Sequence, residues 1–475
     1  MSTTNETQLT EKEAKNRDFI LNGPMFKVVL QIGIPIAFFQ GINQLLRVVD
    51  SFMAASIDAT AASMVTYFGQ MNLIIVGLGL GLAAGATLKI SQGYGAGDYE
   101  KVKKQISSIF AFAAIACLAL ILLIVPLATP LMRWMNTPAE FIAQGRTFFL
   151  IEFAVTMIWI INAIYLALER VQGNTKKILN MNLIAMAINM GFTAFSVYIL
   201  REGITFIAIA SLISQLFILA VAIYNLSGRK SEVFKFSLKE VSLKRVILAP
   251  MLLISVPIMI ERSAFHVGKT VVNVMITGLG PLVVGGLGIS NLLCGIGVSP
   301  QMGFQDSTVA IMAQNKGAGS YKRVLEGFKA IFVINCVLAV TFFIPLFFFA
   351  RHTTSLFAIG DPYFHDILYR VHIIDVWSVL VLGAYSATTA LLFGLGLTRL
   401  TLFLNVCRIF LFRIPVLLFL QHFTTMGPEA AGFVMAFSNI AVTVLGLGVG
   451  VICIRKVCRE HGIKFFEKEK LILEN

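Results

Sequence analysis

Several polar side chains lie inside an apolar run that is long enough to cross a bilayer. Gln40, Asn43, Gln44, Arg47 and Asp50 recur at steps of one, three and four residues. Steps of three and four place side chains along one side of a helix. Because an arginine at mid-membrane costs about 2.5–3.5 kcal/mol to insert, it normally faces a water-filled cavity or a charged partner. These five residues, the first polar stripe, could therefore bind a polar solute or an ion.

A second set of polar residues, the second polar stripe, occupies a later apolar run and comprises Glu261, Arg262, His266, Lys269 and Asn273. Steps of four, three and four align its last four members, with Glu261 beside them. The stripe either lines a functional cleft or forms a buried ion-pair network that holds the helix. Since histidine titrates near neutral pH, His266 could relay protons or simply form a packing hydrogen bond.

The next apolar run adds Gln305 and Asp306. Asp306 could bind a solute or neutralise Lys269 or Arg262. Two further basic residues inside an apolar run, Arg408 and Arg413, could pair with Asp375 or reach a membrane interface.

The two stripes belong to an internal repeat. One constant shift places Pro35 on Pro257, Gln40 on Arg262, Gln44 on His266 and Arg47 on Lys269. The same shift carries segment 92–97 onto segment 314–319, and a shift larger by one residue places Asn182 on Asn405. Agreement of prolines, glycines and polar residues over this length indicates a duplicated protein.

The composition predicts an all-α polytopic membrane protein. Of 475 residues, 57% are hydrophobic and 13% are charged, whereas soluble domains have about 25% charged residues. Runs of about 20 apolar residues can span the hydrocarbon core. Twelve such spans are expected at about 26–50, 60–87, 105–130, 139–166, 178–200, 203–227, 247–276, 281–312, 326–350, 366–393, 400–420 and 430–454.

The chemistry available to the chain excludes several function classes. The polar first 25 residues predict no cleaved leader, and the six scattered cysteines have no metal-ligand spacing. A Walker-type phosphate loop is absent from the sequence, and no soluble domain large enough for catalysis is expected. We therefore predict a transporter, not an enzyme, without a cofactor.

Basic residues set the expected topology. Lys101, Lys103 and Lys104 fall on one connection, and the segment 229–245 is also rich in lysine and arginine. The positive-inside rule then places both termini in the cytosol. The net charge of +13 is thus explained by topology and contact with membrane lipids, not by nucleic-acid binding.

The expected domains are a cytosolic, poorly ordered N-terminal tail (1–24), an N-lobe (25–227), a basic cytosolic linker (228–246), a C-lobe (247–455) and a cytosolic C-terminal tail (456–475). Six spans in each lobe make the repeat parallel. In such transporters the substrate site lies near mid-membrane between lobes that rock against each other.

Short motifs in this order resemble the multidrug and toxic compound extrusion (MATE) family. They are Val49-Asp50, the loop that begins at Gly95, Asn136-Thr-Pro138, Gln172-Gly-Asn-Thr-Lys176, Pro257 with Glu261, and Gly317-Ala-Gly319. The resemblance covers nearly the whole chain. It implies a V-shaped, monomeric pair of six-helix bundles that exports small organic compounds by exchange with protons or sodium ions. It also implies that Asp50 and Glu261 are the acidic residues for ion coupling.

Two departures from the family pattern affect the expected substrate. One subgroup has an acid in span 10 near position 382, where this chain has Leu382, and Asp375 lies about two turns earlier. Arg47, Arg262 and Lys269 add positive charge to the expected cleft. A basic cleft repels cations and holds anions through charge-assisted hydrogen bonds.

The sequence thus predicts a MATE-like exporter in the cytoplasmic membrane whose substrate could be anionic. The alternative is a flippase of the same superfamily for an anionic lipid-linked sugar or cell-wall precursor. The sequence leaves open whether Arg47 and Lys269 bind substrate or only pair with Asp50 and Glu261.

Overall fold

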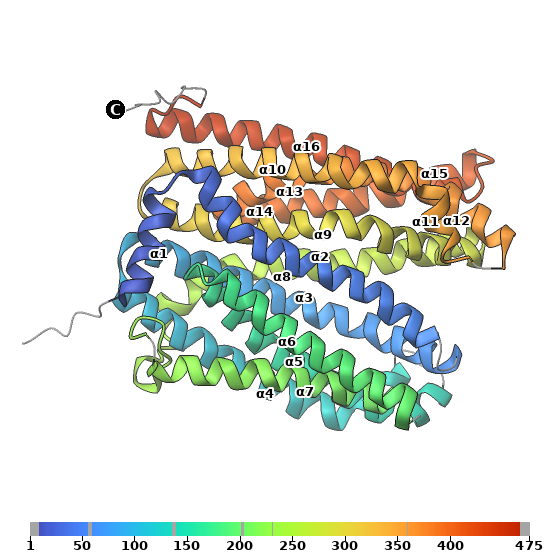
Figure 1. Cartoon of the computed structure of the whole chain (residues 1–475), viewed down its shortest axis with the longest axis horizontal. Coiled ribbons are helices and arrows are strands. Elements are labelled where there is room, and N and C mark those ends of the chain that lie inside the picture. Colours follow the sequence, from blue (N-terminus) through green and yellow to red (C-terminus); the bar gives the residue numbers. More distant parts are fainter. Residues whose placement is uncertain are drawn as a thin grey trace, which may run out of the picture.

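The computed structural model describes residues 9–55, 59–134, 139–200, 204–229, 231–358 and 360–465, without the side chains of some helical residues, including 47–55 and 59–67. All of the elements it describes are helices (Figure 1). The N-lobe contains α2 (Met25–Ala55), α3 (Ala59–Ala96), α4 (Tyr99–Trp134), α5 (Ala139–Val171), α6 (Thr175–Ala194), the π-helix η1 (Phe195–Leu200), α7 (Ile204–Tyr224) and the π-helix η2 (Asn225–Arg229).

The linker holds a short 3-10 helix, η3 (Leu238–Glu240). The C-lobe contains α8 (Arg245–Ile276), the 3-10 helix η4 (Thr277–Leu279), α9 (Pro281–Gly317), α10 (Tyr321–Phe348), α11 (Ala350–Ser355), α12 (Pro362–Asp375), α13 (Trp377–Gly394), α14 (Thr398–Val406), the π-helix η5 (Cys407–Arg413), α15 (Ile414–Phe423) and α16 (Glu429–His461).

The twelve expected spans each correspond to one helix or to consecutive helices. Among the described residues, 11 helical segments are long and apolar enough to cross a bilayer. The fifth expected span is formed by α6 and η1, outside those 11 segments. The tenth bends between α12 and α13, and the eleventh changes to a π-helix at η5. The predicted all-α polytopic architecture is present.

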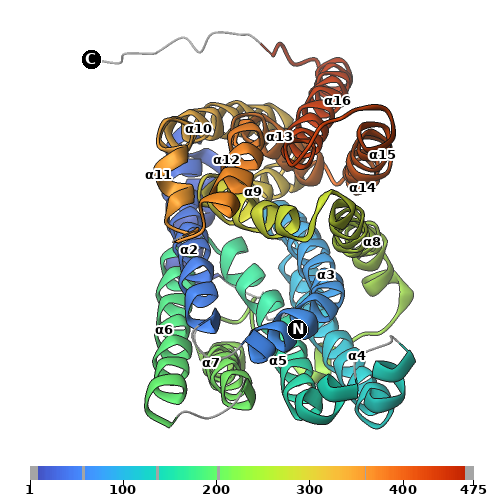
Figure 2. The ribbon, with the colours of Figure 1, turned by 90° about the vertical axis from the view of Figure 1, so that its right-hand side faces the viewer.

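Four central helices join the lobes. Figure 2 shows α4 to α7 on one side and α10 and α12 to α16 on the other, with α2, α3, α8 and α9 between them. Among the inter-lobe contacts, α3 packs most extensively on α8 and α2 on α9. The first two long helices of each lobe therefore form most of the contact between the lobes.

Small residues allow α3 and α8 to approach closely. Gly77, Gly81 and Gly85 face Ser263, Met259 and Ser255 in turn. A methyl group added to Gly81 would lie 2.4 Å from the backbone nitrogen of Met259. Rows of small residues at every fourth position are the usual means by which helices pack tightly within membranes.

A reciprocal crossing joins α3 and α9 near their C-terminal ends. A methyl group on Gly95 would lie 2.0 Å from the carbonyl oxygen of Gln314, and one on Gly317 would lie 2.0 Å from the carbonyl oxygen of Gln92. The Gln314 side chain also donates to the Val171 carbonyl at 2.7 Å. These repeat-related contacts hold the lobes together at the end of the bundle that carries α1 and the C-terminal end of α16, which we term the α1 end (Figure 1).

The N-terminal tail differs from the sequence prediction. Residues Glu11–Asn22 form helix α1, whose N-terminus is closed by reciprocal hydrogen bonds between Thr10 and Glu13. Such a capping box satisfies backbone donors that a helix start leaves unpaired, and Ile20 is only 1% exposed. The prediction of a poorly ordered tail is therefore wrong for these residues, because the tail gains a cap and an apolar anchor.

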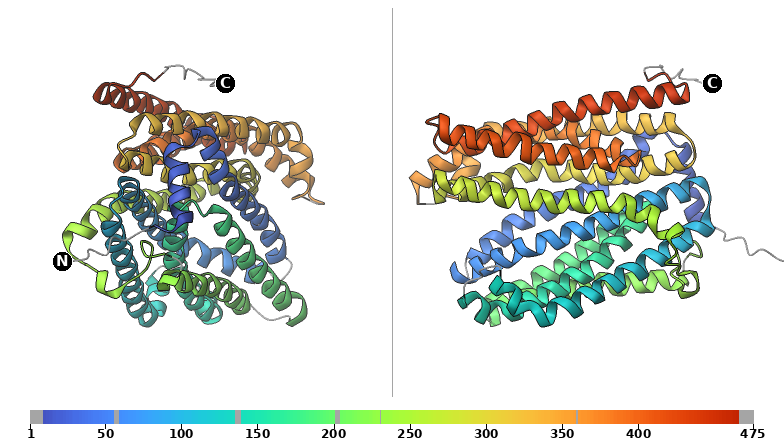
Figure 3. Two further views of the ribbon diagram at one scale, coloured as in Figure 1. Left: turned by 60° about the vertical axis from the view of Figure 1, so that its left-hand side comes forward. Right: turned by 180° about the vertical axis from the view of Figure 1, so that it is seen from behind.

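Helix α1 contacts both lobes. Arg17 donates to the carbonyls of Tyr94 and Gly95 in α3, at 3.0 and 2.8 Å. At the other end of the helix, Arg323 of α10 donates to the Ile20 carbonyl at 3.2 Å. Figure 3 shows this dark-blue helix lying across the end of the bundle. It bridges the lobes where α3 and α9 cross.

Candidate functional site

The second polar stripe lies on α8, and we call its three basic residues, Arg262, His266 and Lys269, the α8 stripe. They lie along α8 beside the residues that pack against the N-lobe. Ser255, Met259 and Ser263 make the close contacts with α3. A helix repeats every 3.6 residues, so Arg262 and His266 fall on this same face, toward the opposite end of the bundle. Arg262, His266 and Lys269 are half-buried. Arg262 and His266 therefore lie on the inter-lobe side of α8, and Lys269 follows His266 by about one helical turn.

The first polar stripe lies on α2, and we call it the α2 stripe. It begins on the face of α2 that packs on α9. Gln44 is buried and donates to the Leu292 carbonyl at 2.9 Å, so this predicted site residue makes an inter-lobe contact. Gln40 and Asn43 are half-buried. The side chains of the two remaining members, Arg47 and Asp50, lie outside the described residues.

The acidic and amide residues predicted on α9 differ in their surroundings. Gln305 is buried with 7% exposure, whereas Asp306 is half-buried. The ion pairs formed within the described part of the chain include none that involves Asp306. Direct neutralisation of Arg262 by Asp306 is therefore not observed.

Glu261 points into the C-lobe. Its carboxylate is 3% exposed and accepts hydrogen bonds from Thr401 Oγ1 at 2.7 Å and Asn405 Nδ2 at 2.8 Å. Both partners belong to α14, which brings them to α8 from far along the chain. A buried carboxylate is costly unless it is paired or neutralised. Its bonds to two neutral groups make Glu261 a chemically suitable acceptor for a proton or a small cation.

Two arginines lie near this part of the C-lobe interior. Arg408 donates to the Asn439 side chain at 2.8 Å and lies over the Phe265 ring, 5.3 Å from its centroid. Arg413 is 1% exposed and donates to Ser438 at 3.1 Å. The ion pairs described in this structure do not join either arginine to Asp375. The pairing that the sequence suggested is thus replaced by hydrogen bonds to neutral side chains.

Asp375 is held by hydroxyl groups instead. Ser290 donates to its Oδ2 at 2.8 Å and Ser378 to its Oδ1 at 3.1 Å. The carboxylate is 2% exposed at the break between α12 and α13. The C-lobe thus contains two buried carboxylates, each bonded to hydroxyl or amide groups.

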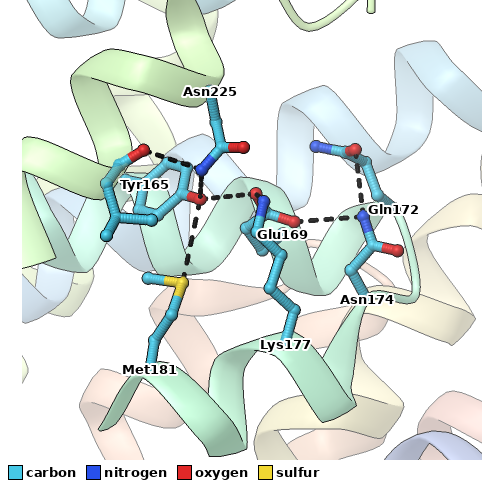
Figure 4. Close-up of polar contacts among 8 residues, drawn as sticks. Tyr165, Glu169, Gln172, Asn174, Lys177, Met181 and Asn225 are labelled. Atoms are coloured by element: carbon cyan, nitrogen blue, oxygen red, sulfur yellow. Dashed lines mark hydrogen bonds and ion pairs between the residues drawn. The ribbon is translucent and has the colours of Figure 1, made fainter. Parts of the chain in front are cut away.

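The N-lobe has a polar network of a different kind at the α1 end (Figure 4). The Glu169 carboxylate accepts from Tyr165 at 2.6 Å and from Asn174 at 3.0 Å, and it pairs with Lys177. Asn225 donates to the Tyr165 hydroxyl at 2.9 Å. A cavity of about 150 Å³ lies between this network and α1. The network fixes the ends of α5, α6 and α7 relative to one another.

The C-lobe does not repeat this network. The shift that places Asn174 on Leu397 also places Glu169 on Leu392 and Lys177 on Leu400. Leu392 belongs to an apolar cluster and is fully buried. The two halves of the repeat therefore use different interactions at equivalent helix ends.

Replacing Glu169 with alanine should lower the stability of the N-lobe. The change leaves donors of Tyr165 and Asn174 without their acceptor and separates Lys177 from its counter-ion, with an expected cost of about 2–3 kcal/mol. A lower midpoint of thermal unfolding in detergent would report this loss. Glu169→Gln retains an acceptor for Tyr165 and should have a smaller effect. An unfolding midpoint of Glu169→Ala equal to that of the wild type would contradict the assignment.

The sequence prediction missed several partners of the buried charged residues in the C-lobe. Thr401 is an ordinary helical threonine in the sequence, and its role depends on the packing of α14 against α8. Asn405 carried a usable signal, because the repeat places it opposite another asparagine, Asn182. Asn439 carried no such signal.

Comparison with known proteins identifies the family. The family model MatE matches residues 35–195 and again residues 257–419. The matches fall in the two lobes and start at the paired prolines Pro35 and Pro257. Together they cover more than half of the chain, in agreement with the predicted duplication.

Whole-length relatives agree with this assignment. The chain is 21% identical to the probable multidrug resistance protein YoeA of Bacillus subtilis, over 90% of this chain and 92% of that protein. It is 22% identical to the FAD transporter of Shewanella oneidensis, over 85% of this chain and 89% of that protein. A solved structure, the outward-facing conformation of a multidrug resistance MATE family transporter, superimposes with a TM-score of 0.88 at 17% identity, over 95% of this chain and all of that one. The chain therefore belongs to the MATE family and is a multi-pass membrane transporter, not an enzyme.

Proposed function

We propose that the protein is a secondary active exporter that moves small organic anions out of the cytosol in exchange for protons or sodium ions. The observation that carries the proposal is the set of basic residues on α8, in which Arg262 and His266 lie on the inter-lobe face that packs on the glycines of α3 and Lys269 follows one turn further along. Such a surface favours a negatively charged substrate through charge-assisted hydrogen bonds.

Two further points support an anionic substrate. The FAD transporter of Shewanella oneidensis has a similar length and 22% identity, and FAD carries a negatively charged diphosphate. The Glu261 carboxylate lies on a different face of α8, bonded to Thr401 and Asn405, so it does not offset the charge of the stripe by direct pairing. Substrate and coupling ion can thus occupy separate places on one helix.

In the proposed cycle, Asp50 or Glu261 takes up the coupling cation from outside. When Glu261 is neutralised, its hydrogen bonds to α14 change and the position of α8, which carries the basic stripe, is altered. The substrate is then released outward and the lobes reset. The protein works as a monomer in the cytoplasmic membrane with both termini in the cytosol, and it needs neither nucleic acid nor a cofactor beyond the coupling ion.

A flippase for an anionic lipid-linked sugar is the second candidate. The same basic stripe favours it, because a lipid diphosphate would carry the charge that Arg262 and Lys269 attract. The exporter is preferred because the whole-length relatives include the multidrug resistance and FAD transporters.

Uptake into everted vesicles, which corresponds to export from the cell, tests the proposal. A pH gradient and then a sodium gradient would be applied with two fluorescent dyes that are matched in size and differ in charge. The proposal expects transport of the anionic dye by the wild type under one of the gradients, and loss of gradient dependence in Asp50→Asn. Transport of the cationic dye alone would overturn the anionic assignment. Failure of both dyes, with a labelled lipid-linked sugar moving instead, would favour the flippase.

A further inference from the structure

A groove of about 650 Å³ lies beside the start of α10 at the α1 end. Three segments form it: the corner between α1 and α2 (22–26), the first turns of α10, and residues 463–465 that follow α16. These segments come from the two ends and the middle of the chain. The groove is separate from the α8 stripe.

The rim of the groove is strongly basic. It is lined by Lys322, Arg323, Lys329 and Lys464, and Glu326 is the one carboxylate among the described lining residues. Lys322 and Lys464 are exposed. The lining side chains therefore carry a net positive charge toward an incoming anion.

The other two basic residues hold the walls in place. Arg323 donates to the carbonyls of Ile20 and Gly23, at 3.2 and 2.7 Å, and so fixes the α1–α2 corner. Lys329 donates to the Phe465 carbonyl and lies 4.5 Å from the centroid of that ring. This contact brings the segment that carries Lys464 over α10. Hydrogen bonds therefore hold the walls of the groove in place, and its basic side chains lie close together.

The basic rim continues directly into an exposed apolar row on α10. Lys322, Lys329 and Val333 lie on one helical face, since steps of seven and four residues return to nearly the same side. Below Val333 this face is apolar and exposed, with Val333 at 52%, Val337 at 60%, Val340 at 48%, Ile344 at 49% and Phe348 at 74%. In a membrane-spanning helix, exposed apolar side chains face lipid tails.

We propose that this groove binds the headgroup of an anionic phospholipid. Its phosphate lies beside Lys322 and Lys464, and its acyl chains follow the apolar row from Val333 to Phe348. Basic pockets between membrane helices on the cytosolic side are suited to anionic headgroups. A free phosphate ion would match the rim but would make no use of the apolar row, so the lipid fits both features.

Native mass spectrometry of the full-length protein in detergent tests the site with phosphatidylglycerol and phosphatidylcholine. One basic residue near a membrane surface contributes about 1 kcal/mol to the attraction of anionic lipid. The double variant Lys322→Gln/Lys464→Gln should therefore bind phosphatidylglycerol about 30-fold more weakly, since 1.4 kcal/mol is a tenfold change. Binding of phosphatidylcholine should be weak and unchanged.

The control double variant Lys101→Gln/Lys456→Gln removes the same charge from exposed positions outside the groove. An equal loss of phosphatidylglycerol binding in this control would overturn the site in favour of general surface charge. A third variant, Val337→Asn/Val340→Asn, should weaken lipid binding while leaving the rim intact. If inorganic phosphate displaced phosphatidylglycerol and this third variant bound normally, the groove would be a site for free anions and the lipid assignment would fail.

Discussion

Glu261→Gln should reduce export driven by an ion gradient by at least about tenfold, the factor that corresponds to 1.4 kcal/mol. The amide keeps nearly the same shape and can still accept from Thr401. It cannot carry the negative charge that binds a proton or a sodium ion. Because Glu261 is buried and bonded to neutral groups, restoring its charge elsewhere on α8 would not replace it.

Coupled ion flux in proteoliposomes, recorded together with substrate flux, measures this effect directly. Thr401→Val and Asn405→Leu each remove one hydrogen bond and should reduce transport less than Glu261→Gln. Glu152→Gln, which changes a carboxylate in α5 of the other lobe, is the matched control and should retain transport. Substrate flux in Glu261→Gln with unchanged ion dependence would show that this carboxylate has no part in coupling.

Valine at Gly95 or Gly317 should open the α1 end of the molecule. In each case the first added carbon would lie 2.0 Å from a carbonyl oxygen of the other lobe, a distance that requires the helices to separate. Overpacking of this kind typically costs about 1–3 kcal/mol. The valine destabilises only the conformation in which α3 and α9 are in contact. Each 1.4 kcal/mol of this destabilisation raises the ratio of the separated to the contacting conformation about tenfold.

The separation can be measured between spin labels on Asp98→Cys and Ser320→Cys, in a chain whose six native cysteines have been replaced. The label distance should increase in Gly95→Val and Gly317→Val, and transport should fall because the cycle stalls. Gly191→Ala is the control, since a methyl group there meets no atom within 4 Å. An unchanged distance distribution in both valine variants would show that the crossing does not hold the lobes together.

The architecture could be predicted well from the sequence because it depends on local apolar runs and on an internal repeat. Apolar runs of bilayer length determine the helices. Pro35 and Pro257 mark the same position in both halves, and the family matches start at these residues. The spacing of Arg262, His266 and Lys269 was sufficient to align them along one side of a helix, and the structure places Arg262 and His266 on the side of α8 that packs on α3.

Other features depend on contacts between distant segments, which spacing cannot show. The hydrogen bonds from Thr401 to Glu261 and from Arg323 to Ile20 each join residues more than a hundred positions apart. The helix α1 was missed although Thr10 and Glu13 have the spacing of a capping box, and its contacts with Tyr94 of α3 could not be seen in the sequence. The spacing that marked Gln44 as a candidate site residue could not show that its amide also donates to the Leu292 carbonyl across the lobes.

The most direct test of the proposed anionic substrate compares two variants on α8. Arg262→Gln/Lys269→Gln removes two charges from the α8 stripe, and Arg245→Gln removes one charge at the start of the same helix. Initial rates of gradient-driven export would be measured for the matched anionic and cationic dyes. Since a hydrogen bond to a charged group contributes about 1.5–3 kcal/mol, export of the anionic dye should fall more than about tenfold in the double variant and remain near the wild-type rate in Arg245→Gln. Unchanged anion export by the double variant, or a wild type that exports only the cationic dye, would contradict a substrate role for the α8 stripe.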